Sequence, residues 1–193
     1  MNLNDIKNYC LNNNIPLISG ETENLLKLII SIKKPLKVLE IGTAVGYSAA
    51  LMLSYGAQSV YSIEIDENRY FQAKQNLNDL GLLGRATLYL GDASQILPNI
   101  TGSYDFAFID GPKGQYIYYI PYIINLLSCG GVIICDNINY RGLVDGSVKM
   151  RRNSLTMVNN LKKFIEYITD DSRLITQIFD IAEGVSLSCK ICG

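Results

Sequence analysis

The sequence predicts an α/β fold: a seven-stranded, mostly parallel sheet with helices on both faces and a C-terminal antiparallel hairpin. Strand and helix patterns alternate along the 193 residues with short connections, as in parallel sheets. A glycine turn, Gly42 to Gly46, follows the first strand. The last two strands flank Ala182-Glu183-Gly184, which favours a hairpin. The length suits a single domain over residues 1–193.

The expected helices and strands follow one another with few residues between them. Two helices, over 2–13 and 21–33, form an N-terminal helical element, residues 1–33, and the core follows over residues 34–193. The core strands are expected at 37–41, 59–64, 86–90, 104–109 and 131–135. The core helices are expected at 46–55, 67–80, 94–98, 114–128 and 153–169. The hairpin strands are expected at 174–179 and 185–189.

Two helix boundaries have a physical reason in the sequence. Asp66 can cap the helix over 67–80, and Gly81 can end that helix in a left-handed turn. Gly130-Gly131 is expected to end the helix that precedes the strand Val132 to Cys135.

The composition limits the chemistry that this chain can perform. Hydrophobic residues make up 48% and charged residues 18%, a balance typical of globular proteins, and there is no histidine. Without histidine there is no His general base, no Ser-His or Cys-His pair and no His-ligated zinc. Catalysis must therefore rely on carboxylates, lysine, tyrosine, cysteine or a metal held by oxygen ligands.

The cysteine pattern and the termini indicate the compartment. The five cysteines are scattered: Cys10, Cys129, Cys135, Cys189 and Cys192. The odd number argues against a disulfide framework and favours a reducing compartment. Cys189-x-x-Cys192 has the spacing of a redox or metal pair but lacks the second pair of a zinc site, so we interpret both as incidental. With no signal-peptide pattern and no apolar run long enough to span a bilayer, we expect a cytoplasmic protein.

A strand–turn–helix motif indicates where a nucleoside binds. Val38-Leu39-Glu40-Ile41 runs into Gly42-Thr43-Ala44-Val45-Gly46-Tyr47-Ser48, and the next strand ends at Glu64, 22 residues after Gly42. An acid at about that distance holds a ribose in nucleotide-binding βαβ units. Ala44 stands where a second glycine would let the backbone approach a pyrophosphate. A nucleoside without a pyrophosphate fits better, and S-adenosylmethionine (SAM) is the leading candidate.

Five strands end in polar residues or glycines. In open parallel sheets, ligands bind at the carboxyl ends of the strands, so we expect a site at one rim of the sheet. The residues at these ends are Glu40 to Gly46, Glu64, Gly91-Asp92-Ala93, Asp110 and Asp136-Asn137. A single acid in such a place is commonly a helix cap, but capping alone does not explain five.

Three of these residues are candidate metal ligands. Asp110, Asp136 and Asn137 offer two carboxylates and one amide oxygen, a hard donor set suited to Mg²⁺, Mn²⁺ or Ca²⁺. The alternative is that Asp136-Asn137 is an Asx turn and that Asp110 caps the next helix. The residues alone do not decide between the two.

Lys113 is a candidate general base. It lies three residues after Asp110, and a nearby cation would disfavour its ammonium form. The alternative is a solvated loop lysine. Tyr116, Tyr118, Tyr119 and Tyr122 follow at helical spacing, which is typical of a core or a dimer surface, so we assign them no catalytic role.

A basic segment stands out in a chain whose net charge is −1. From Arg141 to Lys163 there are six basic residues and one acid, so this segment carries +5 and the remainder −6. Such an island can attract a polyanion, and the alternative is a solvated loop and helix face.

Taken together, these motifs resemble the cation-dependent SAM O-methyltransferases, the family of catechol and caffeoyl-CoA O-methyltransferases. The resemblance covers about Ile15 to Lys190 and rests on the Leu39–Ser48 turn, Ile63-Glu64, Gly91-Asp92-Ala93, Phe108-Ile109-Asp110 and Gly130-Gly131-Val132 with Asp136-Asn137. It implies a Rossmann-like methyltransferase fold and a homodimer. It also implies a divalent cation, with Mg²⁺ favoured over Mn²⁺ or Ca²⁺, at Asp110, Asp136 and Asn137, and Lys113 acting at the substrate hydroxyl. It implies SAM contacts from Glu40, Gly42, Thr43, Ala44, Gly46, Tyr47, Ser48, Glu64, Asp92, Ala93 and Asp110.

Within the family, the chain looks most similar to the bacterial branch that methylates 5-hydroxyuridine in tRNA. Lys113-Gly114-Gln115-Tyr116, Arg141-Gly142-Leu143-Val144 and the stretch Lys149 to Arg152 carry this resemblance, whereas Gly111-Pro112 departs from it. It implies tRNA contacts from Arg141, Arg151 and Arg152. The basic segment favours tRNA over a small catechol as the substrate. A non-catalytic SAM- or RNA-binding module and an NAD-dependent oxidoreductase are the other hypotheses.

Overall fold

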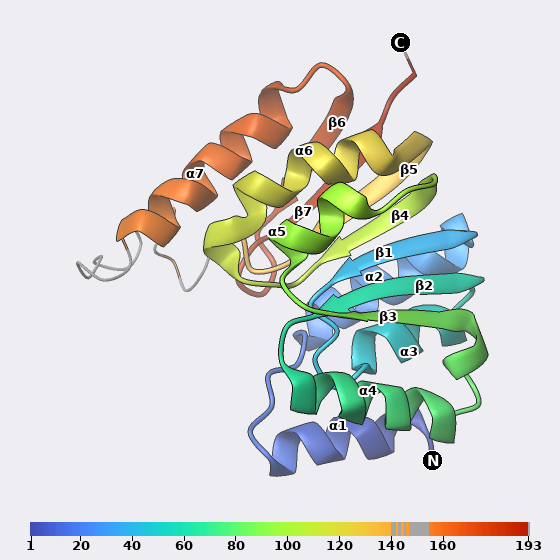
Figure 1. The fold of residues 1–193 in the computed structure, drawn as a ribbon. Coiled ribbons are helices and arrows are strands. Elements are labelled where there is room, and N and C mark those ends of the chain that lie inside the picture. Colours follow the sequence, from blue (N-terminus) through green and yellow to red (C-terminus); the bar gives the residue numbers. More distant parts are fainter. Residues whose placement is uncertain (140–141, 143, 145, 147–154, 193) are drawn as a thin grey trace. The chain divides into compact units, whose positions relative to one another are not determined.

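A computed structural model describes residues 1–139, 142, 144, 146 and 155–192 (Figure 1). The chain divides into two compact units, Met1–Asn99 and Ile100–Gly193, and each is described by itself. Among the described residues, no helix is long and apolar enough to cross a membrane. The expectation of one domain with an N-terminal helical element, and that of a cytoplasmic protein, stay predictions.

The first unit holds three parallel strands and the helices that connect and cover them. In chain order its elements are α1 (Leu3–Asn12), α2 (Gly20–Lys33), β1 (Lys37–Ile41), α3 (Tyr47–Ser54), β2 (Ser59–Glu64), α4 (Glu67–Asp79), the 3₁₀ turn Leu83–Arg85, β3 (Ala86–Leu90), α5 (Ala93–Ile96) and the 3₁₀ turn Leu97–Asn99. The strands lie in the order β3-β2-β1. Lys37 pairs with Ser59, and Val60 pairs with Ala86, both in parallel register.

Local capping explains where three of these helices begin and end. Asn2 and Asp5 form a capping box at the start of α1, and the Ser19 hydroxyl accepts from the Thr22 N–H at the start of α2. The Asp66 side chain accepts the Arg69 N–H at 2.9 Å, which confirms the predicted cap of α4. Gly81, at φ +69°, follows the end of that helix, as predicted.

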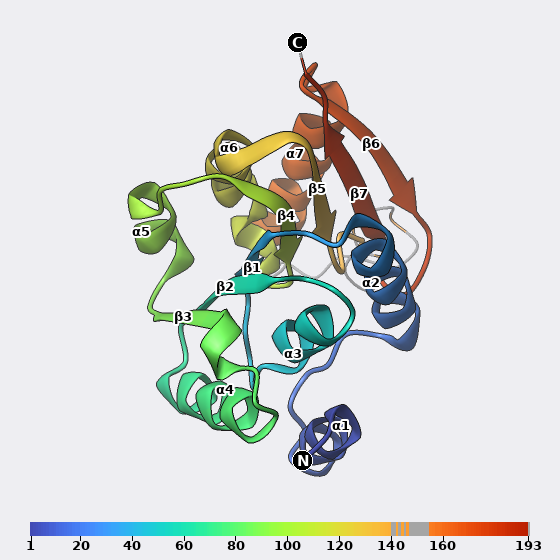
Figure 2. The ribbon, with the colours of Figure 1, turned by 90° about the vertical axis from the view of Figure 1, so that its right-hand side faces the viewer.

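Helix α3 is the centre of the first unit. Every residue from Tyr47 to Leu53 is buried, because α3 packs on β2 with one side and against α1 and α2 with others (Figure 2). A helix that is apolar all round needs such enclosure. The N-terminal helices therefore complete the core around α3, which begins directly after the glycine turn.

In its described residues, the second unit holds four strands and two long helices. Its elements are β4 (Tyr104–Ile109), the 3₁₀ turn Lys113–Gln115, α6 (Tyr116–Leu126), β5 (Leu127–Cys135), α7 (Leu155–Asp170), β6 (Leu174–Phe179) and β7 (Val185–Lys190). The strands lie in the order β4-β5-β7-β6. β4 and β5 are parallel, whereas β7 is antiparallel to both β5 and β6. The predicted C-terminal hairpin is therefore confirmed, and so is the mixed, mostly parallel α/β class.

The prediction that Gly130-Gly131 ends a helix is wrong. α6 ends at Leu126, and β5 already begins at Leu127. Its register with β4 jumps from Tyr104–Leu127 to Phe106–Val132, so the glycines lie in a bulge of the strand. A side chain at Gly131 would come within 2.8 Å of the Ser128 carbonyl, and Gly130 has a φ of +72°. Both glycines are thus required by the bulge rather than by a helix end.

The expectation that the terminal cysteines are incidental is corrected by a disulfide between Cys129 and Cys192. Their Cα atoms lie 5.4 Å apart. The antiparallel register that pairs Val132 with Cys189, continued by three residues in each direction, sets Cys129 opposite Cys192. The bond joins the bulge of β5 to the C-terminal segment across 63 residues of sequence. Cys10, Cys135 and Cys189 are free thiols, and burial raises the pKa of Cys135 to about 12.

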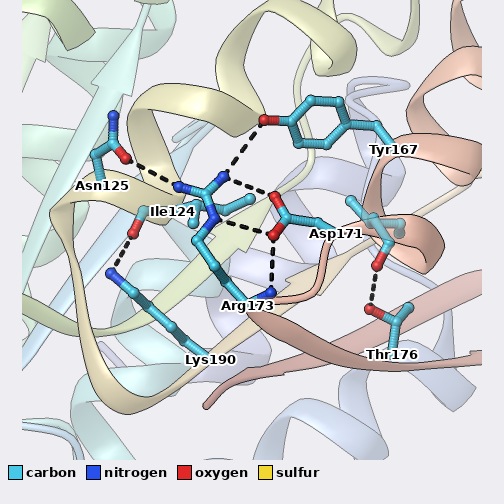
Figure 3. A network of polar contacts seen from close by, with 8 residues as sticks. Ile124, Asn125, Tyr167, Asp171, Arg173, Thr176 and Lys190 are labelled. Atoms are coloured by element: carbon cyan, nitrogen blue, oxygen red, sulfur yellow. Dashed lines mark hydrogen bonds and ion pairs between the residues drawn. The ribbon is translucent and has the colours of Figure 1, made fainter. Parts of the chain in front are cut away.

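A polar network joins the ends of α6, α7 and β7 (Figure 3). The Arg173 guanidinium donates to both carboxylate oxygens of Asp171, at 2.9 and 2.6 Å, and to Asn125 Oδ1 at 3.3 Å. Lys190 Nζ donates to the Ile124 carbonyl at 2.7 Å. These bonds satisfy the last carbonyls of α6 and fix the entry into β6.

Candidate functional site

The glycine turn of the first unit has an unusual backbone. Gly42, Ala44 and Gly46 all have positive φ values, of 98°, 46° and 84°. A side chain at Gly46 would come within 3.2 Å of the Ala73 Cα, so the glycine allows α4 to pack closely on the turn. The Asn76 side chain of α4 donates to the Val45 carbonyl at 2.8 Å. The turn is thus held open in a conformation in which the N-terminus of α3 can face a ligand.

Glu64 is tied directly to this turn. Its Oε2 accepts the N–H of Ala44 at 2.7 Å, and its Oε1 accepts the N–H of Asp66 at 2.9 Å. The side chain is 6% exposed, and each oxygen keeps a second lone pair. The carboxylate therefore organises the turn and the start of α4 while retaining the capacity to accept ribose hydroxyls. Its contact with a ribose stays a prediction.

Glu40 and Thr43 belong to a buried polar chain. The Ser62 hydroxyl hydrogen-bonds both the Glu40 carboxylate and the Thr43 hydroxyl, the latter at 2.5 Å. All three residues are 1% exposed or less. This chain links the end of β1, β2 and the turn, so Glu40 and Thr43 have a structural role whether or not they touch a ligand.

Tyr47, in the first turn of α3, is connected to the N-terminal helices through Glu23. The buried Glu23 carboxylate accepts from Lys7 Nζ at 2.8 Å, from Lys27 Nζ and from the Tyr47 hydroxyl. Burial alone would raise the pKa of Glu23, but the bonds from Lys27, Lys7 and Tyr47 outweigh it and lower the pKa to about 2. Burial and the Glu23 carboxylate raise the pKa of Tyr47. One carboxylate thus joins α1, α2 and α3, a role that the sequence reasoning missed.

The other predicted nucleoside contacts lie near the N-terminus of the short helix α5. The Asp92 carboxylate caps it by accepting the Ser94 N–H at 2.8 Å, and Ala93 is buried. The Gly91 N–H donates to the Glu64 carbonyl at 2.8 Å, so β3 ends beside the end of β2. Ser48 is 7% exposed in the first turn of α3. These residues share the carboxyl-end side of the first unit's strands, as predicted.

In the second unit, the structure brings Asp110 and Asp136 together. Ile109 pairs with Cys135 in the parallel register of β4 and β5, and the two aspartates follow this pair. The Asp136 N–H also donates to the Ile109 carbonyl at 3.0 Å. Asn137 follows with a φ of +56°, a left-handed conformation that asparagine tolerates. Two carboxylates and an amide therefore leave neighbouring strand ends within one unit.

This donor set fits a divalent cation. Two carboxylates and one amide oxygen are hard ligands that leave coordination positions for water and substrate. Asp136 is 1% exposed, and its Oδ1 accepts the Asn137 N–H at 2.9 Å, so the Asx-type hydrogen bond of the alternative interpretation is present as well. Within the described part of the chain, no group of three or more His, Cys, Asp or Glu side chains is arranged to hold a metal. A cation here would thus rely on the amide and on non-protein ligands, and the metal stays a prediction.

Lys113 is a partly buried partner of this set rather than a solvated loop lysine. Its side chain is 14% exposed, and Nζ lies 2.6 Å from Asp110 Oδ1. The same nitrogen donates to the Tyr116 hydroxyl at 3.0 Å. The Lys113–Gln115 turn is held in place by α7, because the Asn160 side chain donates to the Gly114 carbonyl at 2.9 Å. The ammonium group is thereby kept beside the strand ends.

The four tyrosines of α6 divide into two kinds. Tyr116 and Tyr119 are 0% and 3% exposed, whereas Tyr118 and Tyr122 are 55% and 43% exposed. Burial, with the nearby Asp110, raises the pKa of Tyr116, so its hydroxyl stays protonated. The sequence reasoning gave these residues no functional role and so missed the hydroxyl of Tyr116. The spacing Lys113-x-x-Tyr116 is the only signal that could have pointed to it.

The predicted RNA contacts Arg141, Arg151 and Arg152 lie outside the described residues, and they stay predictions. Of the six basic residues of the segment, Lys162 and Lys163 lie within the described residues, and both are exposed on α7.

Comparison with known proteins identifies relatives along nearly the whole chain. The model of a family described as O-methyltransferase matches residues 3–191. The caffeoyl-CoA O-methyltransferase of Stellaria longipes is 27% identical over 180 residues, which cover 86% of this chain and 73% of that protein. The catechol O-methyltransferase of Niastella koreensis is 26% identical over 153 residues, 76% of this chain and 67% of its own.

A solved structure shares the fold. A Staphylococcus aureus protein with a provisional caffeoyl-CoA O-methyltransferase assignment matches with a TM-score of 0.90 and 28% identity. The match covers 98% of this chain and 92% of the other. It confirms the methyltransferase type of Rossmann-like fold that the sequence predicted.

Proposed function

Because the chain belongs to the O-methyltransferase family, and is thus a SAM-dependent methyltransferase, we propose that its acceptor is a small phenol of the catechol type. The proposal is that the hydroxyl to be methylated has a second oxygen on the neighbouring ring carbon. The observation that carries it is the cluster of Asp110, Asp136, Asn137 and Lys113, whose chemistry suits an acidic hydroxyl. The names of the two curated relatives support the phenolic class.

The proposed methyl donor site lies in the first unit. The turn from Gly42 to Gly46 and the helix start at Tyr47 would bind the amino-acid end of SAM through backbone N–H groups. Glu64 would accept the two ribose hydroxyls with its remaining lone pairs. Asp92 and Ala93 would border the adenine.

The proposed acceptor chemistry lies in the second unit. Asp110, Asp136 and Asn137 would hold a divalent cation, which when bound would supply Lewis acidity that favours the ionised hydroxyl. In its neutral amine form, which a bound cation would favour over the ammonium, Lys113 would take the hydroxyl proton on Nζ. Asp110 Oδ1, 2.6 Å from Nζ, keeps Nζ at the strand ends, so the base is already in position for the proton transfer. Methylation of the resulting oxyanion by SAM then depends on orientation and electrostatics.

A second acceptor, 5-hydroxyuridine in tRNA, is favoured by a different observation. Its 5-hydroxyl also has an oxygen on the neighbouring ring carbon, the C4 carbonyl oxygen, so the same donor set would serve it. The basic segment from Arg141 to Lys163, with a charge of +5, would attract a polyanion, and a neutral catechol gives no reason for it.

The two acceptors can be separated with the purified full chain. SAM and Mg²⁺ are supplied with catechol, with caffeoyl-CoA, or with tRNA that contains 5-hydroxyuridine, and the products are identified by mass spectrometry. O-methylation of catechol or of caffeoyl-CoA supports the proposal, and methylation of tRNA alone transfers it to the second candidate. Failure to methylate any of the three acceptors contradicts both.

A further inference from the structure

We propose that Tyr116 is a positioning residue whose hydroxyl holds Lys113 and fixes the spacing of the two strand ends that carry Asp110 and Asp136. The proposal rests on the proposed function, because Lys113 has a role only if the chain methylates a hydroxyl. The ring of Tyr116 belongs to the core of the second unit, and its oxygen belongs to the candidate site.

The Tyr116 hydroxyl is a junction of three elements. It lies 3.2 Å from the carbonyl of Ile109 at the end of β4 and 3.1 Å from the carbonyl of Asp136 just beyond β5. It also lies 3.0 Å from Lys113 Nζ, in the turn that precedes α6. Since Ile109 precedes Asp110, the hydroxyl contacts the backbone of both aspartate-bearing segments and the ammonium of Lys113.

The hydrogen-bonding capacity of a phenol matches this arrangement. Its single proton can be shared between the two carbonyls, and its oxygen accepts from the ammonium. Lys113 Nζ is then held from two sides, by Asp110 Oδ1 at 2.6 Å and by the hydroxyl at 3.0 Å. Two fixed acceptors restrict the rotamers of a long side chain, so the amine reaches an acceptor hydroxyl from one direction only.

The packing of the ring makes the hydroxyl immobile. Tyr116 is fully buried and packs edge-to-face on Phe164 of α7, with ring centroids 5.5 Å apart. Lys113 Nζ lies 3.0 Å from the hydroxyl and 5.4 Å from the centroid of the Tyr116 ring, so the lysine contacts the oxygen rather than the ring face. Because the ring contacts do not need the oxygen, Tyr116→Phe separates the packing role from the positioning role.

The test is a double-mutant cycle between Tyr116→Phe and Lys113→Met. Lys113→Met keeps the stem and removes the ammonium. Tyr104→Phe is the matched control, because Tyr104 is 4% exposed at the opposite end of β4. For each variant, kcat and the KM for SAM are measured with Mg²⁺ and catechol or 5-hydroxyuridine tRNA, whichever the wild type methylates. Urea unfolding of the same variants gives a readout that does not depend on activity.

We expect Tyr116→Phe to lower kcat about tenfold, as loss of one hydrogen bond to a charged group would, and to leave the KM for SAM within about twofold. On the Lys113→Met background, the same change should lower kcat no further. Tyr104→Phe should leave kcat within about twofold. In urea unfolding, the midpoint of the double variant should fall by less than the sum of the decreases that the two single variants show.

Three results would overturn the proposal: an unchanged kcat in Tyr116→Phe, an equal tenfold loss on the Lys113→Met background, or additive losses in urea. The second would mean that the hydroxyl only supports the fold. If the wild type methylates no acceptor, the proposed function fails, and the urea cycle still decides whether Tyr116 holds Lys113. Should Tyr116→Phe not fold, 3-fluorotyrosine at position 116, a weaker acceptor, replaces it in the same cycle.

Discussion

At the scale of single residues, one candidate site carboxylate in each unit has two roles at once. Glu64 accepts backbone N–H groups at 2.7 and 2.9 Å and is also the proposed ribose ligand. Asp110 pairs with Lys113 at 2.6 Å and is also a proposed metal ligand. Removing either carboxylate therefore changes both the local backbone and the ligand site, and experiments need variants that separate the two effects.

Glu64→Ala should weaken SAM binding about ten- to a hundredfold, because charge-assisted bonds to the ribose are worth roughly 1.5–3 kcal/mol. Glu64→Gln should weaken it less, since its amide oxygen can still accept the Ala44 N–H. Isothermal titration with SAM measures both. Glu67→Gln, at an exposed position in the first turn of α4, is the control and should bind like the wild type. Unchanged affinity in Glu64→Ala would remove Glu64 from the cofactor site.

Asp136→Ala should abolish both turnover and Mn²⁺ binding, because it removes one of only two carboxylates in the donor set. EDTA should stop turnover of the wild type without changing its SAM affinity. Calorimetry with Mn²⁺ alone reports the metal site independently of activity. Asp180→Asn, at an exposed residue of the same unit, is the matched control. Full activity in EDTA would contradict the metal assignment.

At the scale of elements, the N-terminal helices are joined to the glycine turn by one buried carboxylate. Glu23 of α2 binds Lys7 of α1 at 2.8 Å and the Tyr47 hydroxyl of α3. α3 starts at the turn, so changes in α1 or α2 can reach the proposed SAM site through this contact. In the second unit, the β5 bulge and the Cys129–Cys192 bond similarly tie a strand to the C-terminal segment.

Glu23→Gln should remove a pH-dependent part of the stability. The pKa of Glu23 is lowered from 4.5 to about 2 in the folded chain, so its stabilising contribution is complete above about pH 4.5 and is lost as the pH falls towards 2. The contribution is on the order of 3 kcal/mol. Urea unfolding at pH 7 and pH 3 measures it, with Glu21→Gln, at an exposed position in the first turn of α2, as the control. A variant that is as stable as the wild type at pH 7 would contradict the network.

Cys129→Ser should lower stability only under oxidising conditions. A bond across 63 residues restricts the unfolded chain by up to about 4 kcal/mol in the loop-entropy model. The wild type should lose this stability in dithiothreitol, whereas Cys129→Ser should not respond to the reductant. Urea unfolding with and without dithiothreitol makes the comparison. Equal sensitivity of both proteins would exclude the bond as a source of stability.

At the scale of the whole molecule, the charge is divided unevenly. The segment from Arg141 to Lys163 carries +5 in a chain of net charge −1, and the exposed Lys162 and Lys163 on α7 belong to it. This asymmetry would raise the association rate and the affinity of a polyanionic substrate, whereas it would not affect the binding of a small neutral phenol.

If the acceptor is tRNA, Arg151→Ala with Arg152→Ala should weaken tRNA binding and flatten its salt dependence by about one unit per lost contact. SAM affinity should not change. Filter binding over a range of KCl concentrations gives the slope, and Lys37→Ala with Lys74→Ala removes the same charge from exposed sites elsewhere. A normal slope in the arginine variant would leave the small phenol as the acceptor.

The sequence by itself determined the order and type of the elements and the chemistry of the candidate site. Apolar runs and capping residues such as Asp66 act within a few positions of the chain, so the strands 37–41, 59–64, 86–90 and 104–109 could be predicted to the residue. The polar residues at strand ends, Glu64 in the first unit and Asp110 and Asp136 in the second, could be identified because ligands bind at the carboxyl ends of parallel strands.

Only the tertiary structure decided the contacts between segments that lie far apart in the chain. The bulge at Gly130-Gly131 depends on the register with β4, and the Cys129–Cys192 bond depends on the register with β7. The Tyr116 hydroxyl meets the carbonyl of Asp136, 20 residues away, because α6 packs on β4 and β5. Hydrophobic patterns specify which face of a helix is buried, but not which polar atom of another element that face will hydrogen-bond. That pairing follows from strand register and packing, which no local pattern encodes.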